Sequence, residues 1–127
     1  GRVRYLGPTS DIDVPVIMGG AVTLIVPTRH DEMFGMVVIE AGACGTPSVA
    51  SRLGGLEELL ECGGGALFPV GDDDALAQAA EAYVKDPEAR AKAGVEARDV
   101  ACMFDWPRVA EQAVAAYQQA LKVRLAR

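Results

Sequence analysis

The 127-residue sequence has few aromatic residues, a single histidine, three cysteines and fewer basic than acidic side chains. Because aromatic residues make up 6% of the chain and hydrophobic residues 50%, aliphatic side chains and alanine must fill most of the core. Cys44, Cys62 and Cys102 are an odd number without metal-like spacing, which predicts free thiols in a reducing compartment. We therefore expect a cytoplasmic protein and, with one histidine, no zinc site.

Positive charge and long hydrophobic runs are also lacking. The net charge of -6 argues against sequence-independent binding of nucleic acid, which needs a basic surface, and makes this segment a poor electrostatic membrane anchor. The longest apolar runs, such as residues 21–27, are far below the roughly 20 residues that a membrane span requires, and no signal-peptide pattern opens the chain. The length fits one domain, and a start at Gly1 without methionine leads us to expect a fragment of a longer protein.

Short apolar runs alternate with helix-like segments and are bounded by glycine and proline. The pattern predicts strands at 3–6, 21–26, 48–51 and 66–70, helices at 36–44, 56–61 and 75–85, and further helices that begin at Pro87 and Trp106. This alternation predicts an α/β fold, a Rossmann-like parallel sheet flanked by helices, with an all-helical C-terminal part. Sheets of this kind bind ligands at the carboxyl ends of their strands.

Several local signals refine this pattern. The continuous apolar run at 21–26 is typical of a strand covered on both faces, whereas Pro69 places the strand at 66–70 near a sheet edge. Residues 11–20, interrupted by Pro15, predict at most a short helix, and one of the aspartates at 72–74 can cap the helix that follows. An apolar stripe on the last helix packs either on its own domain or against a partner; it consists of Ala110, Val114, Tyr117, Leu121 and Leu125.

The polar loop after the second predicted strand carries the candidate site. Backbone N–H groups of Gly35, Met36 and Val37 at the start of a helix suit a phosphate, which a glycine would let come close. Glu40 lies about 7–8 Å further along the helix axis, where a carboxylate can accept hydrogen bonds from a ribose, and Glu32 could bind the hydroxyls of a second sugar. The alternative is that Glu32 only balances the helix dipole; Glu40 would be costly if buried without a partner.

Five motifs in order resemble the C-terminal domain of retaining GT-B glycosyltransferases, in particular glycosyltransferase family 4. They are an E-x7-E pair at Glu32 and Glu40, Phe34-Gly35, the continuation at 44–51, Gly54-Gly55 followed by Glu58, and residues 65–72. The likeness runs from about Val3 to Tyr117. The resemblance implies that the sheet is the C-terminal half of a GT-B fold, and that a hexose is transferred from a nucleotide donor with retention at the anomeric carbon and without a metal or other cofactor.

The resemblance also implies roles for single residues. Glu32 would be the catalytic carboxylate and contact the hydroxyls of the donor sugar, Glu40 would bind the ribose, and Phe34 would border the sugar. The N–H groups of residues 35–37 would face the diphosphate, and Gly55 with its neighbour Gly54 would pass close to the donor. Arg29 and Arg52 either supply positive charge for the phosphates or are ordinary exposed arginines.

In the family an N-terminal domain supplies the acceptor site. We therefore expect residues 1–127 to be a single nucleotide-sugar-binding domain, inactive without that N-terminal domain. Its expected partners are the nucleotide-diphosphate sugar and the missing domain, and not nucleic acid; a membrane periphery for the full-length enzyme and a second copy of the fragment are further candidates. One alternative is a non-catalytic nucleotide-binding or regulatory domain, against which the retained Glu32 and Glu40 argue. Another is a dehydrogenase fragment, for which the G-x-G-x-x-G signature is absent.

Overall fold

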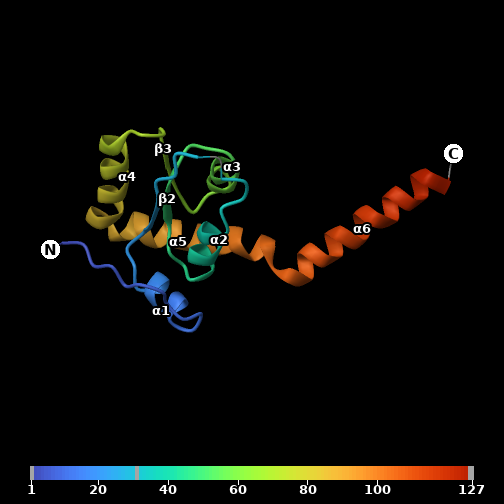
Figure 1. The fold of residues 1–127 in the computed structure, drawn as a ribbon, viewed down its shortest axis with the longest axis horizontal. Coiled ribbons are helices and arrows are strands. Elements are labelled where there is room, and N and C mark those ends of the chain that lie inside the picture. Colours follow the sequence, from blue (N-terminus) through green and yellow to red (C-terminus); the bar gives the residue numbers. More distant parts are fainter. Residues whose placement is uncertain (1, 31, 126–127) are drawn as a thin grey trace.

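Short apolar runs form the sheet, and the segments between them form helices. The computed structural model describes residues 2–30 and 32–125. In chain order the elements are α1 (Asp13–Gly19), β1 (Leu24–Val26), α2 (Met36–Ala43), β2 (Ser48–Ser51), α3 (Gly55–Glu61), β3 (Gly65–Phe68), α4 (Asp73–Lys85), α5 (Pro87–Ala101), the 3-10 turn η1 (Cys102–Phe104) and α6 (Trp106–Leu125). The predicted alternation of strands and helices, followed by helices alone, is confirmed (Figure 1).

The described strands pair in the order β1-β2-β3, all parallel, as predicted. Every residue of β2 is buried, because this strand lies between the other two and helices cover it. β3 forms one edge of the sheet, as predicted, but it ends at Phe68, so Pro69 lies beyond the strand and not within it. The core beside the sheet is aliphatic, as the composition requires; its buried cluster is Val38, Ala50, Leu56, Leu59 and Leu60.

Small residues let α5 pack closely along α2. A Cβ atom added at Gly42 would lie 2.6 Å from the carbonyl oxygen of Ala97, so no larger residue fits there without moving a helix. Local capping signals behaved as predicted: the Asp72 side chain accepts a hydrogen bond from the Ala75 N–H at 2.8 Å, and α5 begins at Pro87. The cysteines are free, also as predicted.

Two of the predicted strands were wrong in whole or in part. Residues 3–6 are not a strand, since no described strand pairs with them, and Val3 is 92% exposed. The strand predicted at 21–26 begins only at Leu24, because Ala21 completes the turn that ends α1 by donating its N–H to Met18. β1 is an edge strand, and Ile25 is exposed, so it is not covered on both faces.

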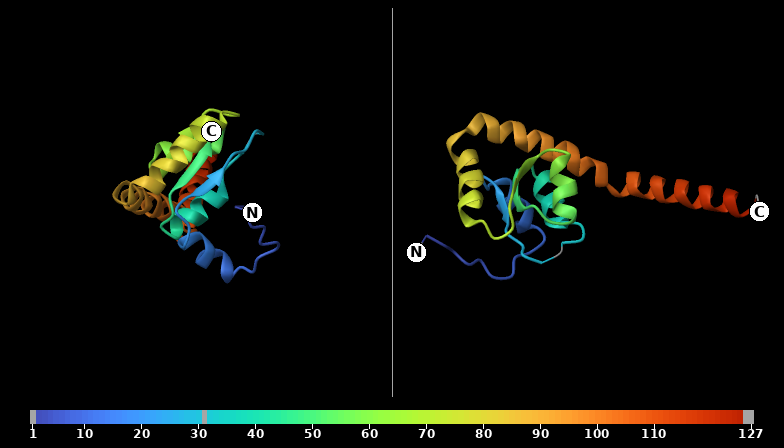
Figure 2. Two further views of the ribbon diagram at one scale, coloured as in Figure 1. Left: turned by 90° about the vertical axis from the view of Figure 1, so that its left-hand side faces the viewer. Right: turned by 90° about the horizontal axis from the view of Figure 1, so that it is seen from above.

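The last helix extends away from the rest of the fold (Figure 1; Figure 2, right). Its principal contact is with η1, and the side chains of Val114, Tyr117 and Leu121 are exposed. Of the two alternatives for the apolar stripe, packing on its own domain is therefore wrong. None of the helices that the described residues form is long and apolar enough to cross a membrane.

Candidate functional site

The carboxyl ends of the three described strands bring three loops together at one edge of the sheet. The loop after β1 contacts the loop after β2, because the Gly55 N–H donates to the carbonyl oxygen of Glu32 at 2.9 Å. The loop after β2 is held in turn by β3, since the Arg52 N–H donates to the Phe68 carbonyl at 2.8 Å. The predicted site residues lie in or beside these loops, where a parallel sheet of this kind places its ligand.

Glu32 and Gly35 form a closed turn at the start of α2. The Oε1 atom of the half-buried Glu32 accepts a hydrogen bond from the Gly35 N–H at 3.1 Å. Gly35 has φ 79° and ψ 44°, a left-handed conformation that favours glycine, and a Cβ there would lie 2.7 Å from a methyl carbon of Leu56. A glycine is needed at position 35 for a different reason from the predicted one. Gly35 is buried against α3, and its N–H donates to Glu32 rather than facing outward.

Met36 and Val37 follow this turn as the first residues of α2. Among residues 2–30 and 32–125, no acceptor pairs with either backbone N–H, whereas the N–H of Val38 already donates to Gly35. Unpaired N–H groups at the positive end of a helix attract negative charge. The two N–H groups therefore remain available to an acceptor at this helix start.

Glu40 is exposed, on the face of α2 opposite the buried Val38 and Ala41. Its exposure explains how an otherwise apolar helix tolerates a carboxylate. Glu40 lines a groove of about 570 Å³ between α1 and α2; the other lining residues are Asp11, Val14, Pro15, Met18, Ala43 and Cys44. A carboxylate thus stands at the wall of a mainly apolar hollow, one to two helical turns beyond the start of α2.

Phe34 contacts a residue for which no sequence pattern predicted a role. Its ring meets that of Phe104 in η1 edge to face, with ring centroids 5.4 Å apart and an interplanar angle of 85°. Phe34 remains 44% exposed, so its contact with Phe104 covers the side chain only in part. The two residues are far apart in the sequence, and no local pattern connects them.

The two arginines near the site already have acidic partners. Arg52 forms an ion pair and hydrogen bond with Glu57 at 2.7 Å, and Arg29 lies 3.9 Å from Asp73. These pairs are well exposed to solvent, where an ion pair contributes little to stability. A ligand phosphate could therefore compete for either arginine at small cost.

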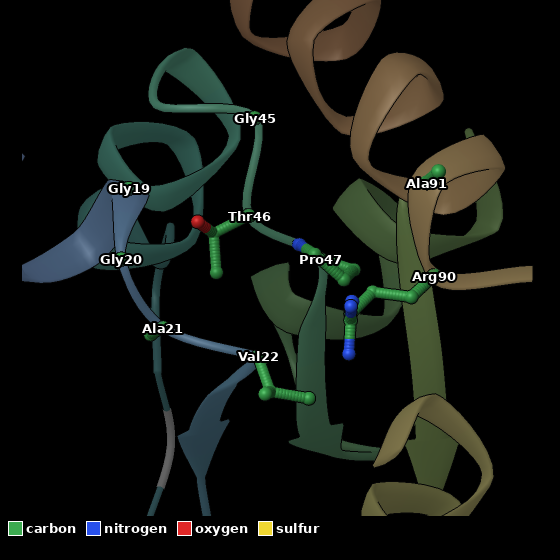
Figure 3. A pocket seen from close by; sticks show the side chains of 9 residues that line it. All are labelled: Gly19, Gly20, Ala21, Val22, Gly45, Thr46, Pro47, Arg90 and Ala91. Carbon is green, nitrogen blue, oxygen red and sulfur yellow. The ribbon is translucent and has the colours of Figure 1, made fainter. Parts of the chain in front are cut away.

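A second cleft lies at the opposite edge of the sheet, beside the amino ends of β1 and β2 (Figure 3). It has a volume of about 300 Å³, and the side chain of Arg90 reaches into it from α5 towards Pro47. The Arg90 Nη1 group donates to the carbonyl oxygen of Tyr83 at 3.2 Å, so the arginine also ties α5 to α4. None of the predicted site residues lines this cleft.

Comparisons with known proteins agree on one family. A family model described as glycosyl transferases group 1 matches residues 1–100. The D-inositol 3-phosphate glycosyltransferase of Saccharomonospora viridis is 36% identical over 119 residues, which are 93% of this chain and 27% of that protein.

Solved structures give the same result. Sucrose-phosphate synthase from Thermosynechococcus elongatus superposes with a TM-score of 0.85 at 34% identity, over 96% of this chain and 31% of that protein. Anabaena Alr3699/HepE in complex with UDP gives 0.86 at 29% identity, over 93% and 32%. A further structure of the same Anabaena protein contains UDP-glucose. The chain thus spans less than a third of the length of each of these three proteins.

Proposed function

Because the chain belongs to the glycosyl transferases group 1 family, we propose that it is the donor-binding part of a longer hexosyltransferase. Its fold matches that of GT-B glycosyltransferases, and the structural neighbour that was solved with UDP and with UDP-glucose supports a nucleotide-diphosphate sugar as the ligand. The observation that carries the proposal is the arrangement along α2: a carboxylate at Glu32, unpaired N–H groups at Met36 and Val37, and a second carboxylate at Glu40 beside a groove.

Each part of the donor has a place in this arrangement. The N–H groups of Met36 and Val37 bind the diphosphate, and the Gly35 N–H holds the carboxylate of Glu32 for the sugar hydroxyls. Glu40 binds the ribose hydroxyls, with the base in the groove between α1 and α2. Phe34 borders the sugar through the exposed part of its side chain, and Gly55 lies behind the sugar-binding carboxylate through its contact with Glu32.

The chemical step in this proposal depends on electrostatic stabilisation. The bond between the anomeric carbon and the diphosphate oxygen breaks, and the acceptor oxygen bonds to the same face of that carbon, which retains its configuration. The acceptor proton passes to the departing diphosphate, so no side-chain base is needed. The N–H groups at the start of α2 stabilise the negative charge that grows on the diphosphate, and we propose that no metal ion takes part. Chelation by EDTA should then leave turnover of the full-length protein unchanged.

The rest of the full-length protein supplies the acceptor site in this proposal, so the isolated chain should bind donor without transferring sugar. Free Cys44, Cys62 and Cys102 support a cytoplasmic location, where thiols stay reduced. The exposed stripe on α6 is the surface through which the chain would contact the rest of the protein or, when isolated, a second copy.

The test is a calorimetric titration of the chain with UDP, GDP and ADP, with their sugar derivatives, and with NAD. We expect one nucleoside diphosphate to bind in preference to the others, and NAD not to bind. Binding of NAD alone would identify a dinucleotide-binding domain. Failure of every nucleotide to bind, both to the chain and to the full-length protein, would refute the proposal.

A further inference from the structure

The loop that follows β2 lies directly against the backbone of the Glu32 loop. The N–H of Gly55 donates to the Glu32 carbonyl at 2.9 Å. A Cβ atom at Gly54 would lie 2.5 Å from that same oxygen, and one at Gly55 would lie 2.5 Å from the carbonyl oxygen of Met33 and 2.8 Å from the Cα atom of Phe34. At these separations a side chain cannot be added unless the backbone of residues 32–34 moves.

The two glycines differ in what they require of the backbone. Gly54 has φ 51° and ψ −135°, a conformation that residues with a Cβ atom rarely adopt. Gly55 is the first residue of α3, and its φ is not left-handed, so alanine can adopt the same backbone conformation. The effect of a Cβ atom there is therefore limited to its contact with the Glu32 loop. Gly55 is therefore the position at which the contact alone can be altered.

Two hydrogen bonds hold Glu32, one at its backbone carbonyl and one at its side chain. Its carbonyl oxygen accepts from Gly55, and its Oε1 atom accepts from Gly35, which is itself seated against Leu56, the second residue of α3. The hydrogen bonds among the described residues leave Oε2 unengaged. The start of α3 thus fixes where the carboxylate stands relative to α2, and with it the position of the free oxygen.

We propose that Gly54 and Gly55 are positioning residues for Glu32: by closing against the Glu32 loop, they place its carboxylate on the donor sugar and so set recognition of the sugar as distinct from the nucleotide. This inference rests on the proposed function. Gly55 acts through Glu32, and the UDP part of the donor, bound along α2, does not depend on it. A change at Gly55 should therefore affect UDP-glucose and leave UDP alone.

The test uses a ratio measured by calorimetry, the Kd for UDP divided by the Kd for UDP-glucose. If the chain selects guanine, GDP and GDP-mannose replace these two ligands. Gly55→Ala should lower this ratio by the same factor as Glu32→Ala, about tenfold or more for one lost hydrogen bond to a charged group. The Kd for UDP should stay within about twofold. In the double variant the ratio should fall no further, because both substitutions remove one interaction.

Gly94→Ala is the matched control. Gly94 also has no left-handed φ, and a Cβ there would meet the carbonyl oxygen of Gly45, away from the site. This variant should lower Tm as Gly55→Ala does and leave the ratio unchanged. A ratio that falls equally in Gly94→Ala would show a general loss of structure and overturn the positioning role.

The remaining outcomes separate the two proposals. If the wild-type chain binds no nucleotide, the proposed function itself fails; if Glu32→Ala lowers the ratio and Gly55→Ala does not, or the two effects add, only the positioning role fails. If Gly55→Ala does not fold, amide hydrogen exchange in the wild-type chain decides. The Gly35 and Gly55 N–H groups should exchange at least about tenfold more slowly than exposed loop amides. Exchange of either at the rate of an exposed loop amide would overturn the inference.

Discussion

Replacement of Glu40 by alanine removes the carboxylate at the wall of the groove between α1 and α2. The side chain is exposed, and none of the hydrogen bonds or ion pairs among the described residues involves it. Alanine is also a better helix former than glutamate at an interior position of α2. The free energy of unfolding should therefore stay unchanged or rise slightly, so that a loss of binding in Glu40→Ala cannot be assigned to unfolding.

The magnitude follows from the bond that is lost. A hydrogen bond to a charged group contributes about 1.5–3 kcal/mol, and the exposure of Glu40 favours the lower end of that range because water competes for the carboxylate. A loss of about 1.5 kcal/mol raises the Kd for UDP roughly tenfold. Glu61→Ala, an exposed glutamate at the end of α3 that does not line the groove, is the control and should leave the Kd unchanged.

Calorimetry with UDP and 2′-deoxy-UDP makes the assignment specific. Wild-type chain should bind 2′-deoxy-UDP several-fold more weakly than UDP, since one of the two ribose hydroxyls is missing. In Glu40→Ala the two ligands should bind alike. If Glu40→Ala binds UDP as tightly as wild type, or keeps the preference for UDP, then Glu40 does not bind the ribose and the donor is placed wrongly along α2.

Three further predictions concern catalysis and stability. In the full-length protein, Glu32→Ala should lower kcat by about 10²-fold and change KM less, because the sugar contact strengthens in the transition state; steady-state kinetics with an unchanged kcat would contradict this. Gly42→Ala should destabilise the chain by about 1–3 kcal/mol in urea unfolding, because its Cβ meets a carbonyl oxygen of α5, whereas Gly19→Ala, with neighbours at 3.8 and 3.9 Å, should not. Burial and the nearby Glu96 carboxylate raise the pKa of Tyr83 above its ordinary value of 10.0. The resulting stability is present below pH 10 and is lost as the pH rises through the higher folded-state pKa, so Tm of Tyr83→Phe should fall less steeply above pH 10 than that of wild type.

Local sequence signals determined most of the secondary structure. The helix at residues 36–44, the strand at 48–51, the cap at Asp72 and the helix start at Pro87 each depend on residues within one or two turns of chain. The same is true of the order of groups along the candidate site, since Glu40 lies on the helix that follows the Glu32 loop.

Only the tertiary structure decided the features that depend on pairing between distant segments. Residues 3–6 have the composition of a strand, but no described strand pairs with them. The sequence pattern of α6 predicts an apolar stripe but not the surface that the stripe packs against. The contact of Gly55 with Glu32 and the edge-to-face contact of Phe34 with Phe104 join segments that no local pattern relates. The sequence by itself predicted which groups a donor would meet. The position of the Glu32 carboxylate was decided by the packing of α3 against the loop after β1, because a side chain's position depends on the packing of its backbone.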